Sequence, residues 1–380
     1  WQKVNGMEHA EIIRKQYNST SRLVLIPSMV VLSLATILAF VFSAGLTTKV
    51  LLIMCTTTSL FVGMIILLGD KHIKYTLVTP SIIIMLAVTL VPMIFLLVMS
   101  VTDVKLLNFN RTWNFVGLDN YLYFFTKDRL FWPTLVRTFE YTVLALLIQL
   151  VLGLGLAVLF QRHFIGRNLV SSFLIIPVMT CPIVIAMLWK SMMNSETGVL
   201  NVLLRKLGGS GINWLTNEPL VWIQNIPLVG PFLVSNANAN IGFVSMILVN
   251  TWQWTPFVFL MVLAGINSLP KEPFEAAYVD GANTWQQFRN ITLPLLKPVM
   301  NVIILMRLID LMKVYDQIYA LFGDNITTRT LNIHIFAIGL TNQNYGRGSA
   351  LSIIVLLFIV TITKVLTTFN EKIDIKRVRK

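Results

Sequence analysis

Long apolar stretches, separated by short polar segments, run along almost the whole chain. About eight of these stretches have the length that an α-helix needs to cross a bilayer. They cover residues 23–45, 50–69, 77–100, 138–160, 170–192, 241–265, 295–322 and 348–369. This pattern predicts an all-α polytopic membrane protein with about eight transmembrane helices.

The composition supports this prediction and excludes an ordinary soluble domain. Hydrophobic residues make up 56% of the 380 positions and charged residues only 12%, which leaves too little polar surface for a soluble fold. The net charge is +13, but the basic residues flank the apolar stretches as membrane flanks do, so we do not expect nucleic acid as a partner. Cys55 and Cys181 both lie inside apolar stretches and are interpreted as small buried hydrophobic residues.

The distribution of Lys and Arg predicts the orientation in the membrane. Residues 1–22 are polar and lack a short cleavable signal pattern, and the first apolar stretch is long enough to span. A cytoplasmic N-terminus puts more than half of the 30 Lys and Arg residues on the cytoplasmic side. An even number of spans then puts both termini in the cytoplasm.

The polar segment between the sixth and seventh predicted spans has the pattern of two short helices. Pro273–Val279 fits a helix that begins with proline, and Asp280–Gly281 predicts a turn that ends it. Asn283 or Thr284 would cap a second short helix, and Leu293–Pro294 is expected to stop it. Because the segment faces the cytoplasm, we expect a docking element for another protein.

The seventh predicted span contains charges at intervals of three residues, at Arg307, Asp310, Lys313 and Asp316. Residues three apart are neighbours on a helix, so these charges would follow one stripe of it. Two roles remain open, namely internal ion pairs that hold helices together and the lining of a polar pathway. Tyr315, next to Asp316, is included among the candidate pathway residues.

The sixth predicted span contains a proline with aromatic neighbours. Trp252, Gln253 and Trp254 precede Pro256, which interrupts the hydrogen bonds of a helix. Sugar rings stack on aromatic faces and form hydrogen bonds at their edges, so the group is a candidate for a sugar-binding cavity. A proline kink packed by ordinary tryptophans explains the same pattern.

Two segments predicted outside the cell are rich in aromatic residues or proline, namely 108–137 and 194–240. An aromatic belt at the membrane surface accounts for them, and contact with an external partner is the alternative.

The motifs of several enzyme classes are absent from the sequence. There is no phosphate-binding GxxxxGK[ST], no HExxH and no GxSxG. The four histidines, at positions 9, 72, 163 and 334, are scattered without metal-ligand spacing. We therefore expect no enzymatic activity, no metal site and no cofactor in this chain.

The segment between the sixth and seventh spans also carries a specific motif. It contains Glu275–Ala277, Asp280–Ala282, Phe288, Ile291 and Leu293–Pro294. At all these positions it resembles the EAA loop of membrane subunits (permeases) of ATP-binding-cassette (ABC) importers. Phe115–Tyr121 (FVGLDNY) and Trp254–Phe257 (WTPF) are similar to the carbohydrate-uptake group, typified by the larger permease of maltose transporters.

The resemblance implies a type I importer fold and a division of the chain. Residues 1–75 would form a cytoplasmic N-terminus and two extra transmembrane helices, 76–370 a six-helix permease core with the EAA loop at 270–294, and 371–380 a basic cytoplasmic tail. The loop would insert into a cleft of an ATPase as a coupling helix. The residues implied to couple to the ATPase are Phe274, Glu275, Ala276, Ala277, Asp280, Gly281 and Phe288.

The resemblance also implies partners and a location. They are a second permease subunit, two ATPase subunits that bind ATP and Mg, and an extracellular or periplasmic solute-binding protein, all at the cytoplasmic membrane of a prokaryote. Two departures concern the solute: a large external domain is missing, and residues 321–325 lack a glycine-glycine-proline run.

Other functions are also open at this point. Besides a carbohydrate, the solute could be a polyamine, phosphate or an acidic saccharide. An ion-driven secondary transporter and a non-transporting scaffold are the alternatives from other classes, and the EAA loop argues against both.

Overall fold

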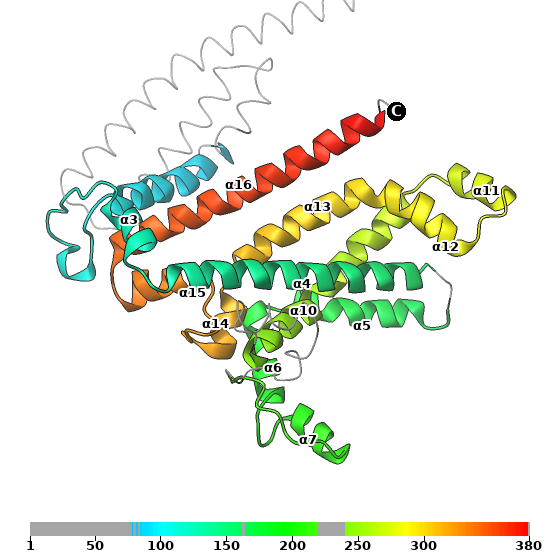
Figure 1. Ribbon diagram of the computed structural model, residues 1–380, viewed down its shortest axis with the longest axis horizontal. Helices are drawn as coiled ribbons and strands as arrows, with labels where there is room; N and C mark the ends of the chain where they lie inside the picture. The colour runs from blue at the N-terminus through cyan, green and yellow to red at the C-terminus, as the bar shows by residue number, and fades with distance from the viewer. Residues whose placement is uncertain are drawn as a thin grey trace, which may run out of the picture. The chain divides into compact units, whose positions relative to one another are not determined.

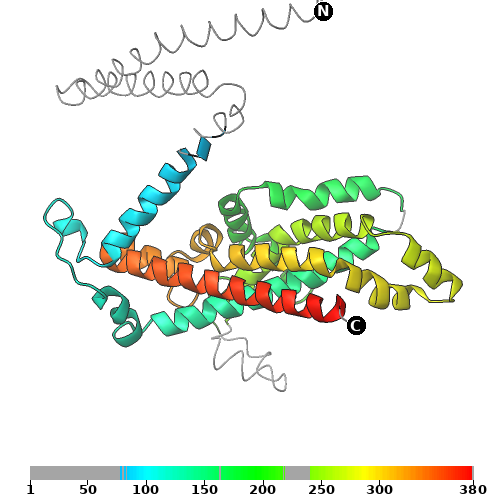
Figure 2. The same ribbon diagram turned by 90° about the horizontal axis from the view of Figure 1, so that it is seen from above.

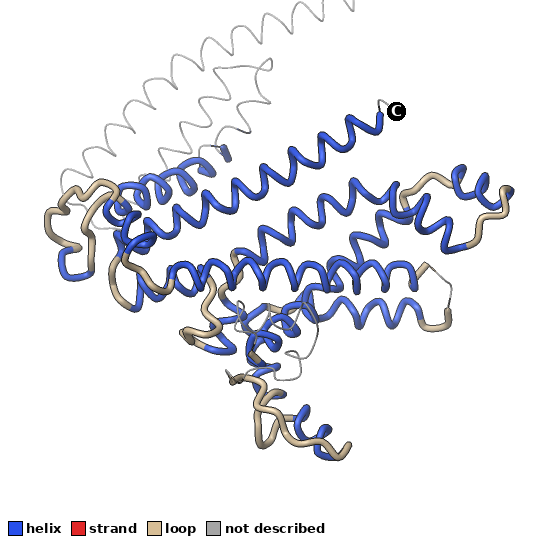
Figure 3. The backbone as a smooth tube through the Cα atoms, viewed as in Figure 1, coloured by secondary structure: helices blue, strands red, loops and turns tan. Residues whose placement is uncertain are grey.

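The computed structural model describes residues 78, 81–82, 84–161, 164–216, 218 and 240–378. The predicted spans 23–45 and 50–69, and with them the predicted N-terminal region of residues 1–75, lie outside these residues. The described chain is helical and contains no strand (Figure 1, Figure 3). By its internal contacts the chain forms two units, Trp1–Phe95 and Leu96–Lys380, and apart from the helix Ile84–Ser100 everything below concerns the second.

The helices have the following bounds. In chain order they are η1 (Leu106–Asn108), α3 (Asp119–Thr126), α4 (Phe131–Leu159), α5 (Arg167–Met179), α6 (Pro182–Met192), α7 (Val199–Lys206), α10 (Ile241–Asn267), α11 (Glu272–Val279), α12 (Thr284–Gln287), the π-turn η2 (Phe288–Thr292), α13 (Leu293–Met312), α14 (Asp316–Phe322), α15 (Leu331–Phe336), the π-turn η3 (Ala337–Thr341) and α16 (Tyr345–Val378).

Three described helices are long and apolar enough to cross a membrane, namely α4, α10 and α16. They confirm the predicted spans 138–160, 241–265 and 348–369, although α4 begins earlier than predicted and α16 continues to Val378. The predicted span 77–100 is represented by a shorter apolar helix, Ile84–Ser100.

The fifth predicted span, 170–192, is not one straight helix. It consists of α5 and α6, which meet at an angle of 103°. Pro177 lies inside α5, and Pro182 is the first residue of α6. A proline disfavours helical backbone in the residue before it, so Cys181 is not helical, and with the extended Thr180 it forms the break. Cys181 is exposed at this break, so the expectation that it is buried is wrong.

The seventh predicted span, 295–322, is wrong at both ends. Helix α13 ends at Met312, and α14 starts only at Asp316. At the other end Leu293–Pro294 does not stop the helix, because α12 runs through η2 directly into α13. The wider π-turn accommodates Pro294, whose ring clashes with the carbonyl four residues earlier in a regular α-helix.

The core of the described bundle contains three apolar clusters, and two of them follow one another along α4 and α10. On α4, Tyr141–Leu146 belong to the first cluster and Ala157–Phe160 to the second. On α10 the first cluster takes its residues from Phe243–Ile247 and the second from Val258–Ile266. Polar side chains occupy the level between the two clusters, and these form part of the site described below.

Close packing between α4 and α10 depends on one glycine. A Cβ atom at Gly153 would lie 2.5 Å from Val258 Cγ1, so only glycine permits this approach. Gly155, one half-turn further along α4, does not have this role, because no heavy atom of a neighbouring element lies within 4 Å of a Cβ placed there.

Candidate functional site

The EAA segment (residues 270–294) projects from one end of the bundle, opposite the end that carries α3 (Figure 2). Helix α11 ends at Val279, and Gly281 turns the chain with a φ of 77°. This φ lies in the left-handed region, which side chains with a Cβ rarely adopt. The predicted pair of short helices with a glycine between them is therefore confirmed.

The start of α12 is fixed by reciprocal hydrogen bonds. Gln286 N donates to Asn283 Oδ1 at 2.8 Å, and Asn283 N donates to the side chain of Gln286, also at 2.8 Å. Such a capping box satisfies two backbone donors at a helix start. Of the two predicted capping residues, Asn283 is the one used.

The predicted coupling residues divide into two groups. Glu275, Ala276, Asp280 and Gly281 are exposed, whereas Phe274, Ala277 and Phe288 are half-buried. Phe274 and Glu275 also line a groove of about 790 Å³ beneath α11.

Three exposed apolar side chains of the EAA segment were not among the residues predicted from the sequence. They are Tyr278, Val279 and Trp285. Val279 is 85% exposed. Apolar residues next to one another on a surface typically mark a contact with a partner. The sequence indicated this surface in part, because Tyr278 and Val279 are apolar residues at the two positions that the motif leaves open between Ala277 and Asp280.

A buried polar network lies at mid-bundle, between the two apolar clusters. It consists of Gln149 on α4, Asn250 and Gln253 on α10, Arg307 on α13 and Gln317 on α14. All five side chains are at most 2% exposed. Buried polar groups need hydrogen-bond partners, and here the five side chains provide partners for one another.

The two tryptophans of the predicted sugar-binding group lie apart. Trp254 covers the guanidinium of Arg307, with 4.4 Å from its ring centre to Arg307 Cζ. Trp252 is 42% exposed and packs edge to face on Trp189. Trp252 and Trp254 are two residues apart on a helix, so their side chains point to different sides. Gln253, between them, is buried in the network.

The predicted stripe of four charges is broken by the end of α13. Arg307 Nη1 lies 3.4 Å from Asp310 Oδ2, and this pair matches the expected spacing of three residues. Lys313 and Asp316 lie beyond the last residue of α13. Asp310, Lys313 and Asp316 are all exposed on this subunit.

Tyr315 lies in the break between α13 and α14. Its ring stacks on Tyr319 at 5.2 Å between centres and contacts Phe336 at the same distance. Asn332 Nδ2 donates to the carbonyl of Met312 at 3.3 Å, which satisfies one of the carbonyl groups left free by the end of α13.

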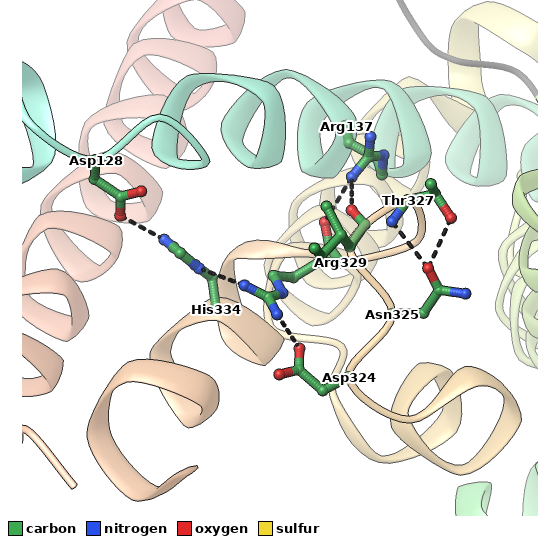
Figure 4. Close-up of polar contacts among 8 residues, drawn as sticks. Asp128, Arg137, Asp324, Asn325, Thr327, Arg329 and His334 are labelled. Atoms are coloured by element: carbon green, nitrogen blue, oxygen red, sulfur yellow. Dashed lines mark hydrogen bonds and ion pairs between the residues drawn. The ribbon is translucent and has the colours of Figure 1, made fainter. Parts of the chain in front are cut away.

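A second polar cluster joins the segment before α4 to the loop between α14 and α15 (Figure 4). His334 Nε2 lies 2.7 Å from Asp128 Oδ2, and Arg329 pairs with Asp324 at 2.6 Å. Arg137 Nη1 donates to the carbonyl of Ile326 at 2.8 Å. The loop that lacks the glycine-glycine-proline run is therefore held by charged side chains.

Burial by itself raises the pKa of the Asp128 carboxyl, but hydrogen bonds outweigh this effect. The side chain of His334 and the backbone N–H of Leu130 both bind the carboxylate, and together they hold the pKa of Asp128 below its ordinary value.

Little in the sequence indicated these contacts. Asp128 and His334 are 206 positions apart, so their pairing depends on the tertiary structure. Gln149 offered a signal that was not used, because an amide inside an otherwise apolar span has to find a polar partner.

Comparison with known proteins shows which family the chain belongs to. Residues 149–378 match the model of the family described as "Binding-protein-dependent transport system inner membrane component". The trehalose/maltose transport system permease protein MalF of Thermococcus litoralis is 33% identical over 250 residues, which cover 66% of this chain and 77% of the relative. The trehalose transport system permease protein SugA of Mycobacterium tuberculosis is 30% identical over 288 residues, covering 76% of this chain and 85% of the relative.

A solved structure has the same fold. It is that of a bacterial ABC transporter for import of the acidic polysaccharide alginate, and one of its chains aligns with a TM-score of 0.66 at 23% identity. The alignment covers 80% of this chain and 96% of that chain. The described residues of this chain thus have the fold of an ABC importer permease, and the protein belongs to the family of binding-protein-dependent transport system inner membrane components.

Proposed function

We propose that this chain is one of two permease subunits of an ATP-driven importer that takes up a carbohydrate delivered by a solute-binding protein. The EAA segment carries this proposal. It connects α10 directly to α13, and these are the two helices that bring Asn250, Gln253 and Arg307 to mid-bundle. A movement imposed on the segment at the membrane surface is therefore transmitted to the polar level of the bundle.

The exposed charges of this subunit support a pathway shared with a second permease. Asp310 lies in the last turn of the apolar helix α13, Lys313 and Asp316 lie just beyond its end, and all three are exposed. Charged groups at membrane depth do not face lipid, and they normally face a protein partner or a water-filled cavity. Trp252, also partly exposed, would add an aromatic face to the same pathway.

Support for a carbohydrate comes from the relatives. Their names refer to trehalose and maltose, and the solved structure with the same fold belongs to a transporter that imports a polysaccharide. Neutral saccharides stack on aromatic faces, and this chain offers the partly exposed ring of Trp252 near mid-bundle.

The remaining components follow from the same proposal. Two ATPase subunits would bind ATP and Mg and receive the EAA segment at the cytoplasmic face. Exposed Glu275 would meet a basic group of the ATPase, and Tyr278 and Val279 would be covered by it. The binding protein would dock at the other end, near α3, and ATP and substrate would shift the equilibrium between the outward- and inward-facing states.

The test is purification from the native host with the associated subunits, followed by uptake in vesicles. We expect two ATPases, a second permease and a binding protein to copurify, and ATP-dependent uptake of the saccharide that the binding protein carries. Uptake driven by an ion gradient without ATP would contradict the proposal. A binding protein that carries a polyamine or phosphate would contradict only the assignment of a carbohydrate.

A further inference from the structure

The mid-bundle network contains a chain of five hydrogen bonds that runs in one direction, and Arg307 Nη2 makes one longer side contact, 3.4 Å, to Asn250 Oδ1. Each side chain donates to the next one. In order, Arg307 Nε donates to Gln149 at 3.0 Å, Gln149 Nε2 to Asn250 at 2.9 Å, Asn250 Nδ2 to Gln317 at 2.7 Å, Gln317 Nε2 to Gln253 at 2.9 Å, and Gln253 Nε2 to the carbonyl of Thr180 at 3.0 Å. We call this the amide chain.

The direction of the amide chain is set by its two ends. A guanidinium such as that of Arg307 only donates, and a backbone carbonyl such as that of Thr180 only accepts. Each amide between them must therefore present its oxygen toward Arg307 and its nitrogen toward Thr180. Hydrogen bonds that run in one direction polarise one another, so the loss of one link weakens the others.

The amide chain connects the two places where helices of the bundle are broken. Thr180 lies at the 103° bend between α5 and α6. Gln317 is the second residue of α14, just beyond the break after α13. The broken helices also contact each other, because Lys190 Nζ on α6 donates to the carbonyl of Ala320 on α14 at 3.2 Å.

The surroundings make the amide chain costly to open. Gln149 and Gln253 are fully buried, and Gln317 is 1% exposed. When one link opens, a donor and an acceptor are left buried without the partner they had. The two breaks are therefore held in register by bonds that form or open together.

We propose that Gln149 and Gln317 are positioning residues that hold the translocation pathway in the conformation of this structure. Through the amide chain they fix both helix breaks against α10. This inference rests on the proposed transport function, because it assigns a regulatory role within the same pathway. Alternation of the pathway moves the broken helices, and it requires the amide chain to open first.

The test uses Gln149→Met, Gln317→Met and the double variant in the importer purified with its partner subunits. Methionine keeps the length of glutamine but neither donates nor accepts as an amide does. Thr255→Val is the matched control, because Thr255 is buried on α10 and its hydroxyl has no hydrogen-bond partner among the described residues. Copurification of the ATPase reports correct assembly, and Gln253→Met replaces any variant that fails to assemble.

The first measurement is ATP hydrolysis without the binding protein. Each single variant is expected to raise this rate about fivefold, the ratio that corresponds to one hydrogen bond of ordinary net strength. Because the amide chain opens as a unit, the double variant should rise about as much as either single variant. Thr255→Val should match the unchanged protein.

The second measurement is backbone hydrogen exchange at the two breaks, 180–181 and 313–315. Gln149 forms no hydrogen bond with either break, so faster exchange at both in Gln149→Met reports transmission through the amide chain. Unchanged hydrolysis, independent effects of the two substitutions, or exchange that changes only beside the substituted residue would overturn the proposal. Absence of carbohydrate uptake by the unchanged importer would contradict the proposed function instead and would leave the exchange comparison valid.

Discussion

The turn at Gly281 gives the sharpest test of the EAA segment. Its φ is 77°, and an L-residue in this left-handed conformation costs about 1–2 kcal/mol. No heavy atom of a neighbouring element lies within 4 Å of a Cβ placed there. In this chain the whole effect of Gly281→Val is therefore conformational, and it reduces the population of the native turn roughly 5- to 30-fold.

The matched substitution is Gly281→Asn, because asparagine adopts the left-handed conformation far more readily than valine. We expect Gly281→Val to lower ATP-driven uptake into vesicles about fivefold or more, with the chain still inserted in the membrane. Gly281→Asn should retain most of the uptake.

The pair of variants also separates two explanations. If both fail equally, the ATPase requires a position without any side chain, and the conformational argument is wrong. If Gly281→Val transports normally and copurifies with its ATPase, the turn has no role in coupling.

Three further predictions concern other regions of the bundle. Gly153→Val should destabilise the chain by about 1–3 kcal/mol through overpacking against Val258, seen as a lower melting temperature in detergent, whereas Gly155→Val should have little effect. Trp252→Ala and Asp316→Ala should each reduce uptake several-fold with the complex still assembled, and normal uptake by both would remove them from the pathway. Because the pKa of Asp128 is lowered in the folded protein, its carboxylate stabilises the fold above about pH 4, and this stabilisation is lost as the pH falls through the folded pKa. Asp128→Asn should therefore lower the melting temperature at neutral pH and weaken the dependence of the melting temperature on pH between about pH 3 and 5. If the variant and the unchanged protein lose stability identically in this range, Asp128 does not contribute to the loss.

Local sequence determined the elements whose cause is local. The spans at 138–160, 241–265 and 348–369 follow from apolar length alone. An apolar segment in a membrane has to form its backbone hydrogen bonds internally, and an α-helix does so within one segment. The start of α11, the turn at Gly281 and the cap at Asn283 follow from the backbone preferences of proline, glycine and asparagine.

The length of an apolar stretch gave a wrong prediction where the backbone of the stretch cannot stay helical throughout. The stretch 170–192 has the composition of a span, but Pro182 and the extended backbone before it produce a bend. The stretch 295–322 is similarly apolar, yet its helix ends at Met312, and the freed carbonyl there is satisfied by Asn332 on another helix. Whether a helix continues thus depended on partners distant in the sequence.

Residue types at short and regular spacing are enough to predict the class of this protein, three of its long helices and the motif of the EAA segment. Which polar residues meet depends instead on the tertiary structure. Arg307 finds Gln149 across 158 positions, and Gln253 reaches the bend at Thr180 across 73. In a buried apolar environment each of these groups must have a partner, but the identity of that partner is set by which helices lie side by side.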